Sequence, residues 1–219
     1  MSLLLHFNGS NGSQSFADSS GNSVAVTTES AAAISTTESK FGGASALFDG
    51  ASGGLSVGSQ SDFNLGAGSQ PFTLEMWFYK ASSGTQVLFS KNGGNTSSWS
   101  ASDGLQMELY VSGTAVAFVW RSEGDSNQIQ GGQASLDAWH HIAVSYDGTT
   151  TGLFLDGMSI GTSSATYDTV LDGTPSVTIG EEGGSFVWDG YIDELRISSE
   201  CVYPPGEDFT PPEAEFTGP

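Results

Sequence analysis

The sequence predicts an all-β fold, and three observations point to it. Segments without glycine are short, and their apolar residues alternate with a period of two, which is typical of strands rather than helices. The 30 glycines, together with many serines and threonines, suit short strands joined by tight turns. Hydrophobic residues make up 37% of the chain and aromatic residues 11%, unlike a disordered chain. At 219 residues, a single antiparallel sandwich of two sheets is the simplest organisation.

The first third of the chain predicts short strands separated by polar turns. Residues 3–7 form the first expected strand. Residues 16–22 form a turn in which Asp and Ser side chains can bond to nearby backbone. Further short strands are expected at residues 24–28, 44–48 and 55–57, and a loop at 62–70.

Residues 72–79 carry a stronger strand pattern, with aromatic rings on both faces. The two faces hold Leu74, Met76 and Phe78, and Glu75, Trp77 and Tyr79. A strand with two apolar faces is typical of the centre of a sheet, so this strand is expected to be covered on both sides. The next strands are expected at residues 85–90, 105–111 and 115–121.

Residues 139–162 predict a three-strand meander with turns at Asp147-Gly148 and Asp156-Gly157. Asp-Gly between apolar runs favours a type I′ turn, because Gly accepts positive φ and Asp tolerates it. His140 and His141 invite a metal interpretation. Neighbouring strand residues face opposite sides, however, so packed or exposed histidines are expected instead.

The C-terminal part predicts two last strands and an extended tail. The strands are expected at residues 176–179 and within 186–198. Residues 1–200 therefore form the predicted sandwich, and residues 201–219 form a proline-rich tail, since Pro lacks an amide donor and restricts its predecessor. Tyr203, Phe209 and Phe216 are expected to dock the tail on this domain or on a neighbour.

The charge balance excludes one class of partner. The chain has 25 acidic and 5 basic residues, a formal net charge of −20, and its few cations are too scattered to follow a phosphate backbone. Nucleic acid is therefore not an expected partner. No segment is long and apolar enough to predict a membrane span. The single Cys201 cannot form an internal disulfide.

Four segments, in order, resemble one known family. They are Gly43-Ala44-Ser45-Ala46-Leu47-Phe48-Asp49-Gly50, Phe72-Thr73-Leu74-Glu75-Met76-Trp77-Phe78, the 139–157 meander, and Gly190-Tyr191-Ile192-Asp193-Glu194-Leu195-Arg196-Ile197. Together they resemble the laminin-G-like, concanavalin A-like jelly-roll family over nearly the whole chain. The two ends, Leu3 to Gly9 with Asp18 to Asn22, and Phe209 to Pro212, resemble versions of this domain in tailed-bacteriophage virion proteins. The resemblance implies two antiparallel sheets packed face to face, with ligands carried by rim loops.

The resemblance also implies a structural calcium ion. In the family such an ion often joins the N-terminal Asp-x-Ser-Gly-Asn turn to the Asp of the final strand. The matching residues here are Asp18, Gly21, Asn22 and Asp193, which offer the oxygen ligands that calcium prefers. Asp193 would share its strand face with Tyr191, Leu195 and Ile197, where a buried charge needs compensation. Hydrogen bonds from turn amides or a paired cation are the alternatives.

Catalysis is not expected. Retaining glucanases of this fold carry Glu-x-Asp-x-x-Glu on one strand, which aims three carboxylates into a cleft. No such run occurs, and the adjacent pairs Glu181-Glu182 and Asp193-Glu194 diverge if they lie in regular strands. Phosphate-binding, zinc and nucleophile-elbow motifs are also absent from the sequence.

Glycan binding remains open, because several segments combine aromatic rings with polar groups. Residues 92–99, Asn-Gly-Gly-Asn-Thr-Ser-Ser-Trp, have the composition of a lectin rim loop. The same rings could instead pack the core or an oligomer interface. The candidate glycan-binding residues are Asn95, Trp99, Asp103, Trp120, Arg121 and Trp188.

Two functions follow as hypotheses. The first is a non-enzymatic phage virion surface protein, either a capsid decoration or a small tail-associated protein, with other virion proteins or further copies of itself as partners. The second is a carbohydrate-binding adhesin that recognises host surface polysaccharide. The N-terminus lacks the basic region and long apolar run of a signal peptide, so synthesis in a host cytoplasm and a place on the virion exterior are expected.

Overall fold

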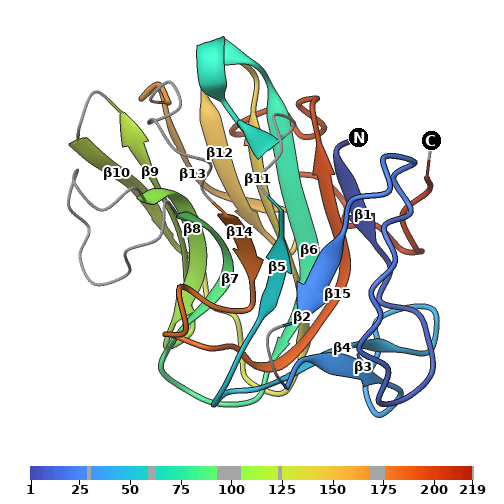
Figure 1. Cartoon of the computed structure of the whole chain (residues 1–219). Coiled ribbons are helices and arrows are strands. Elements are labelled where there is room, and N and C mark those ends of the chain that lie inside the picture. Colours follow the sequence, from blue (N-terminus) through green and yellow to red (C-terminus); the bar gives the residue numbers. More distant parts are fainter. Residues whose placement is uncertain (29–30, 59–62, 93–104, 123–124, 168–175, 219) are drawn as a thin grey trace.

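The structure is a computed structural model, and it describes residues 1–28, 31–58, 63–92, 105–122, 125–167 and 176–218. Two antiparallel sheets, here sheet A and sheet B, pack face to face as a sandwich (Figure 1). The predicted all-β fold is confirmed. Within the described residues no helix is long and apolar enough to cross a membrane.

Among the described residues, sheet A has eight strands, in the order β13-β12-β11-β6-β15-β4-β3, with β1 paired to β15. Its strands are β1 (Leu3–Leu5), β3 (Ala33–Ser35), β4 (Ser45–Asp49), β6 (Phe72–Lys80), β11 (Trp139–Tyr146), β12 (Thr151–Leu155), β13 (Met158–Ser163) and β15 (Asp189–Ser198). The expected central strand is β6, which lies between β11 and β15 and has both faces largely buried.

Sheet B, in the part of the chain that the structure describes, has seven strands in the order β10-β9-β8-β7-β14-β5-β2. Its strands are β2 (Val26–Thr28), β5 (Leu55–Val57), β7 (Thr85–Asn92), β8 (Leu105–Ser112), β9 (Ala115–Ser122), β10 (Asp125–Gly131) and β14 (Ser176–Ile179). A 3₁₀ turn, η2 (Ala67–Ser69), precedes β6.

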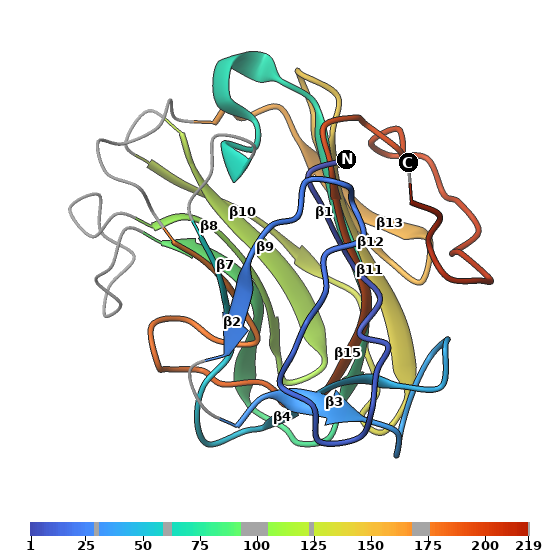
Figure 2. The same cartoon turned by 45° about the vertical axis from the view of Figure 1, so that its right-hand side comes forward.

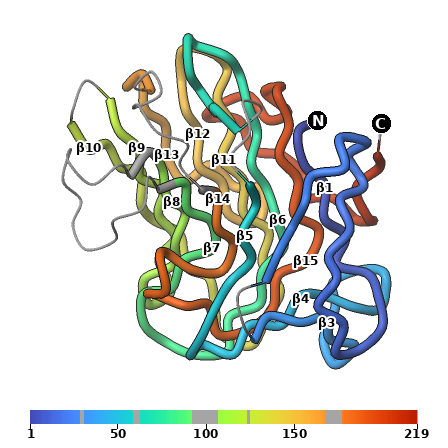
Figure 3. The backbone as a smooth tube through the Cα atoms, viewed as in Figure 1, coloured from blue at the N-terminus to red at the C-terminus, as the bar shows by residue number. Residues whose placement is uncertain are grey.

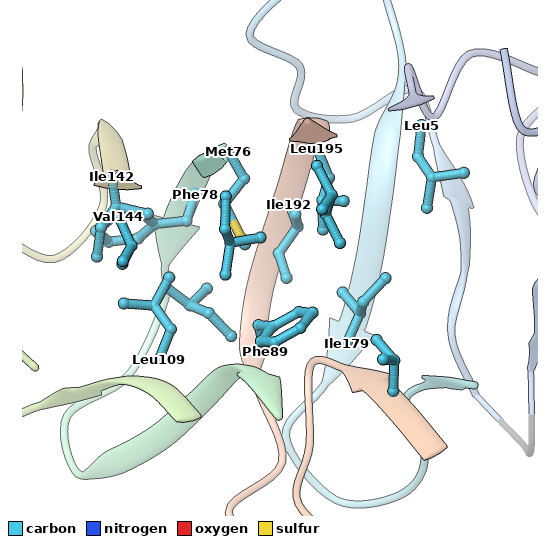
Figure 4. Close-up of a cluster of buried hydrophobic side chains, with 14 of the residues drawn as sticks. Leu5, Met76, Phe78, Phe89, Leu109, Ile142, Val144, Ile179, Ile192 and Leu195 are labelled. Atoms are coloured by element: carbon cyan, nitrogen blue, oxygen red, sulfur yellow. The ribbon is translucent and has the colours of Figure 1, made fainter. Parts of the chain in front are cut away.

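The core lies between the sheets and follows from strand alternation. Met76, Phe78 and Ile192 of sheet A are fully buried and point toward Phe89 and Leu109 of sheet B (Figure 4). Residues at alternate positions therefore face outward from each sheet. Those two outward faces carry the polar side chains on which a functional site can be built.

The meander turn at Asp156-Gly157 has the predicted type I′ character, with φ of 51° and 79°. This turn also meets the tail, because the Phe209 amide donates to the Gly157 carbonyl at 2.8 Å. A Cβ on Gly157 would stand 2.0 Å from the Phe209 carbonyl oxygen. Glycine is thus required both by the turn and by the close approach of the tail.

The tail runs along the outer face of sheet A, on the side away from sheet B (Figure 2). The rings of Tyr203 and Phe209 stack with centroids 3.6 Å apart, and Phe209 also packs against Phe154 of β12. Farther on, the Phe216 amide donates to Glu194 Oε2 at 2.6 Å. Both ends of the chain reach the same side of the molecule (Figure 3).

One strand-face prediction is wrong. The pairing of β15 with β6 shifts register between Asp193 and Arg196, and Glu194 has φ of 50°, so a bulge interrupts the alternation. Leu195 and Ile197 consequently point into the core, whereas Asp193 lies on the other face of the strand. Asp193 therefore does not share a face with Leu195 and Ile197.

Candidate functional site

The outer face of sheet B carries a small apolar cluster that is separate from the core. In β8, Leu109 points into the core, and its neighbours Glu108 and Tyr110 point outward. The cluster consists of Val87, Tyr110, Ala117 and Val119. It forms an apolar floor on a face that also carries polar side chains such as Glu108 and Gln128.

A cavity of about 320 Å³ opens beside this floor. Among the described residues its lining is Tyr110, Val119, Ser126, Asn127 and Gln128. The Gln128 side-chain amide donates to the Tyr110 hydroxyl at 2.7 Å, which fixes both groups at the cavity. An apolar floor with hydroxyl and amide groups at its edge suits a neutral, hydroxyl-rich ligand.

Glu108 lies next to this cavity and is only 2% exposed. It stands opposite Val119 in one neighbouring strand and opposite Ser90 in the other. Burial, followed by the charge and hydrogen bonding of Glu182, raises the pKa of Glu108 to about 8. The Glu108–Glu182 pair therefore holds a proton at neutral pH.

Glu182 reaches Glu108 from the connection between β14 and β15. Glu182 and Ser185 form an isolated bridge, which holds a tight turn. The turn is tied to β7 at its far end, because the Val87 amide donates to the Phe186 carbonyl at 2.9 Å. The fold thus brings together two carboxylates that lie far apart in the sequence.

The outer face of sheet A carries a second buried polar cluster beneath the tail. Glu75 Oε1 accepts bonds from Arg196 Nε at 2.8 Å and Nη2 at 2.5 Å, and Glu75 Oε2 accepts from Tyr203 at 2.7 Å. His141 Nε2 lies 3.2 Å from the same Oε2. Burial acts to raise the pKa of Glu75, but these partners outweigh it and hold the pKa below its usual value. Both oxygens of the Glu75 carboxylate thus have partners within the chain, although His141 Nδ1 has no hydrogen-bond partner, and the bond from Tyr203 fastens the tail.

The structure places His140 and His141 on opposite faces of β11. His140 Nδ1 lies 2.7 Å from Asp156 Oδ2, whereas His141 lies on the opposite face of the strand, against Glu75. The alternation expected for this strand therefore separates them. In the described part of the chain, no group of three or more His, Cys, Asp or Glu side chains could hold a metal ion.

The Asp18 carboxylate, the first of the predicted calcium ligands, organises the N-terminal loop. Its Oδ1 accepts the amides of Leu4 and Ser20, and its Oδ2 accepts the Val24 amide and the Ser20 hydroxyl. Burial opposes ionisation, but these bonds outweigh it and hold the pKa of Asp18 below its usual value. Asn22 donates to the Met1 and Ser2 carbonyls. Gly21 lies in the same turn, with φ of 85°.

Asp193 is fully buried and accepts three amides. Its Oδ2 bonds to the Lys40 amide at 2.8 Å and the Phe41 amide at 3.0 Å, and its Oδ1 bonds to the Glu194 amide at 2.9 Å. Burial raises its pKa to about 7 in spite of these bonds. Hydrogen bonds thus account for Asp18 and Asp193 without an ion, and calcium at Asp18, Gly21, Asn22 and Asp193 stays a prediction.

The sequence-based glycan candidates fall into three groups. Asn95, Trp99 and Asp103 lie outside the described residues. Trp120 and Trp188 are fully buried, since Trp120 stacks with Phe118 and Trp188 packs edge-on against Phe78.

These two rings fill the core, which is the alternative that the sequence left open for them. Their strand positions follow the core alternation, which outweighs the enrichment of Trp at binding sites. Arg121 is 4% exposed and lies opposite Ser126, one of the residues that line the cavity.

Sequence reasoning missed Glu108, Tyr110, Gln128 and Glu182. One signal was available, because Glu108 and Tyr110 alternate with the apolar residues Met107, Leu109 and Val111. A carboxylate in such a strand marks the outward face. Glu108 and Glu182 come together only in the folded sandwich, so no local sequence pattern predicts that they are close.

Comparison with known proteins agrees with this architecture. Residues 49–204 match the family model Laminin_G_3, described as the concanavalin A-like lectin/glucanases superfamily. No curated protein sequence matches the chain.

Similar solved structures share the fold at low sequence identity. One is domain 4 of AbnA, an extracellular arabinanase from Geobacillus stearothermophilus, in complex with arabinotriose, with 18% identity, a TM-score of 0.63, and coverage of 93% of this chain and 94% of that one. Another is the binding domain of botulinum neurotoxin DC in complex with SialylT, with 12% identity, a TM-score of 0.64, and coverage of 92% and 48%.

The same neurotoxin binding domain has been solved in complex with rat synaptotagmin II, and that structure gives 12% identity, a TM-score of 0.65, and coverage of 92% and 49%. The chain therefore spans about half the length of the neurotoxin binding domains that it matches. At these identities the comparisons establish the fold.

Proposed function

We propose that this chain, which belongs to the concanavalin A-like lectin/glucanases superfamily, is a non-catalytic carbohydrate-binding module. The bound sugar lies in the cavity on the outer face of sheet B. Similar structures were solved with arabinotriose and with SialylT, and they support a glycan as the class of ligand. The proposal rests chiefly on the composition of the cavity.

The cavity joins an apolar floor to fixed hydrogen-bonding groups. Tyr110 contributes a ring and a hydroxyl, and Gln128 contributes an amide already oriented by the bond between them. Sugars present both apolar C–H faces and hydroxyl groups, which such a surface can match. The volume of about 320 Å³ lies at the lower end of the range of about 300–1,000 Å³ for small-molecule sites.

A glycan array followed by calorimetric titration of the best ligand tests the proposal. Tyr110→Ala removes both the ring and the hydroxyl, so we expect at least about a tenfold loss of affinity. Tyr110→Phe keeps the ring and should lose less. Tyr191→Phe on β15 is the matched control, because this half-buried tyrosine belongs to sheet A.

The outcomes separate the candidate sites. Affinity that is unchanged in Tyr110→Ala but lost in Trp99→Ala would move the sugar to the rim segment that the sequence predicts. A complete absence of glycan binding would reject the proposal. Tight adsorption to naked capsids or tails would then favour the virion surface role that the sequence suggests.

A further inference from the structure

We propose that the outer face of sheet B holds a divalent cation of the calcium class, with Glu108, Glu182 and Ser90 as its protein ligands. This site lies on sheet B, whereas Asp193 lies on sheet A, so it is distinct from the calcium site that the sequence predicts. It also goes beyond the proposed glycan function, because the cation binds without any sugar.

Glu108 lies in an environment that leaves one of its carboxylate oxygens without a donor. This side chain is 2% exposed, and its Oε2 has no hydrogen-bond partner. Among the described residues, no ion pair involves Glu108. A buried carboxylate oxygen without a donor is costly, and a bound ion is one way in which a native protein compensates it.

A second carboxylate, that of Glu182, lies beside Glu108. Glu182 is 8% exposed and stands close enough to Glu108 for hydrogen bonding and direct charge interaction. Two buried carboxylates in contact repel each other unless a proton or a cation lies between them. The turn that carries Glu182 is held to β7, which keeps the pair together.

A further partnerless oxygen, that of Ser90, lies outside the acidic pair. Ser90 is fully buried on β7, directly opposite Glu108, and its hydroxyl oxygen has no hydrogen-bond partner. The two partnerless oxygens thus stand on adjacent strands at the same level of the sheet. An electropositive ligand between them would satisfy both at once.

The chemistry of the donors selects the class of ion. Carboxylate and hydroxyl oxygens are hard ligands, which suit calcium and magnesium better than zinc. Calcium takes about six to eight oxygens in flexible geometry, so three side chains with water can complete its shell, whereas magnesium demands near-octahedral order. The net charge of −20 also concentrates divalent cations near the protein.

Titration of the chelator-treated full chain with Ca²⁺ alone tests the proposal, with calorimetry and thermal unfolding as readouts. We expect binding that raises the melting temperature of the wild type. Glu108→Gln and Glu182→Gln should each weaken it at least about tenfold, because each removes one charged ligand. Ser90→Ala should weaken it less. Tb³⁺ luminescence excited through Tyr110, two positions along the strand, gives a second readout.

Two controls keep the test decisive. Asp18→Asn alters the site predicted from the sequence, and Glu207→Gln removes one exposed carboxylate of the tail. Both should keep the wild-type affinity. The proposal is overturned if the wild type shows neither heat nor a thermal shift at millimolar Ca²⁺, which would leave a shared proton between the glutamates. Binding that persists in both glutamate variants would also overturn it, and loss in Asp18→Asn alone would place the ion at the N-terminal turn.

Discussion

Glu108→Gln should stabilise the cation-free protein at neutral to mildly alkaline pH. Glutamine keeps the size and shape of the protonated acid, and it cannot ionise. The wild-type folded state holds the Glu108 proton up to a pKa of about 8, whereas the unfolded chain releases it near 4.5. The folded state therefore binds more protons across this window, and wild-type stability falls as the pH rises through it.

The size of the expected stabilisation follows from the difference between the folded-state and unfolded-state pKa values of Glu108. At about 1.4 kcal/mol for each pH unit, a rise in pKa from 4.5 to about 8 corresponds to an upper limit of about 5 kcal/mol. Because Glu182 shares the proton, the two groups titrate as a pair, and the part assigned to Glu108 is smaller. We expect Glu108→Gln to be about 2 kcal/mol more stable than the wild type at pH 8. That gain corresponds to about 4–8 °C in melting temperature for a domain of this size.

Denaturant unfolding from pH 5 to 8.5 in the presence of chelator measures this difference. The advantage of Glu108→Gln should be small at pH 5 and grow steadily toward pH 8. Glu207→Gln, which removes one exposed carboxylate, should follow the wild type and so controls for net charge. A variant less stable than the wild type at pH 8, or a difference that does not change with pH, would refute the reasoning.

Four further predictions concern the outer face of sheet A; denaturant unfolding checks the three that concern stability, and proteolysis checks the one that concerns the tail. Tyr203→Phe should cost about 2 kcal/mol, because it removes the hydroxyl bonded to the charged Glu75. Gly157→Ala should loosen the tail around Phe209, because the new Cβ would meet the Phe209 carbonyl in a left-handed turn; faster proteolysis of the tail would report it, and unchanged proteolysis would contradict it. Glu75→Gln should cost about 3 kcal/mol, since it leaves Arg196 without its carboxylate. With its pKa held down, Glu75 should stabilise the fold above about pH 4.5, and that contribution should disappear in acid.

Strands with strong alternation could be predicted from the sequence almost to the residue. The expected strand at 72–79 is β6, Phe72–Lys80, and the first strand of the expected meander is β11, Trp139–Tyr146. In both segments the alternating apolar residues and the flanking turn residues predict the same strand, so local and global preferences agree. The strand β10, Asp125–Gly131, was missed, because its sequence Asp-Ser-Asn-Gln-Ile-Gln-Gly shows Ile129 as its one apolar side chain. This strand forms by pairing at the edge of sheet B.

The site was harder to predict, for two physical reasons. A bulge adds one residue to a strand and reverses every face beyond it, and nothing near Asp193 in the sequence marks the bulge. Aromatic residues are also ambiguous, because a ring such as Trp120 serves equally well in a core and at a binding site. Its place in the core depends on which face of β9 the opposite sheet covers.

The two outward faces of the sandwich differ in one respect that bears on function. Each has a buried glutamate on a strand inside its sheet, Glu75 on sheet A and Glu108 on sheet B. Both oxygens of Glu75 have partners within the chain, from Arg196, His141 and the Tyr203 hydroxyl of the tail. Glu108 has an oxygen without a donor and an acidic neighbour, an arrangement that costs stability. Stability is commonly given up where a ligand binds, and this difference is why we place both the glycan and the cation on sheet B.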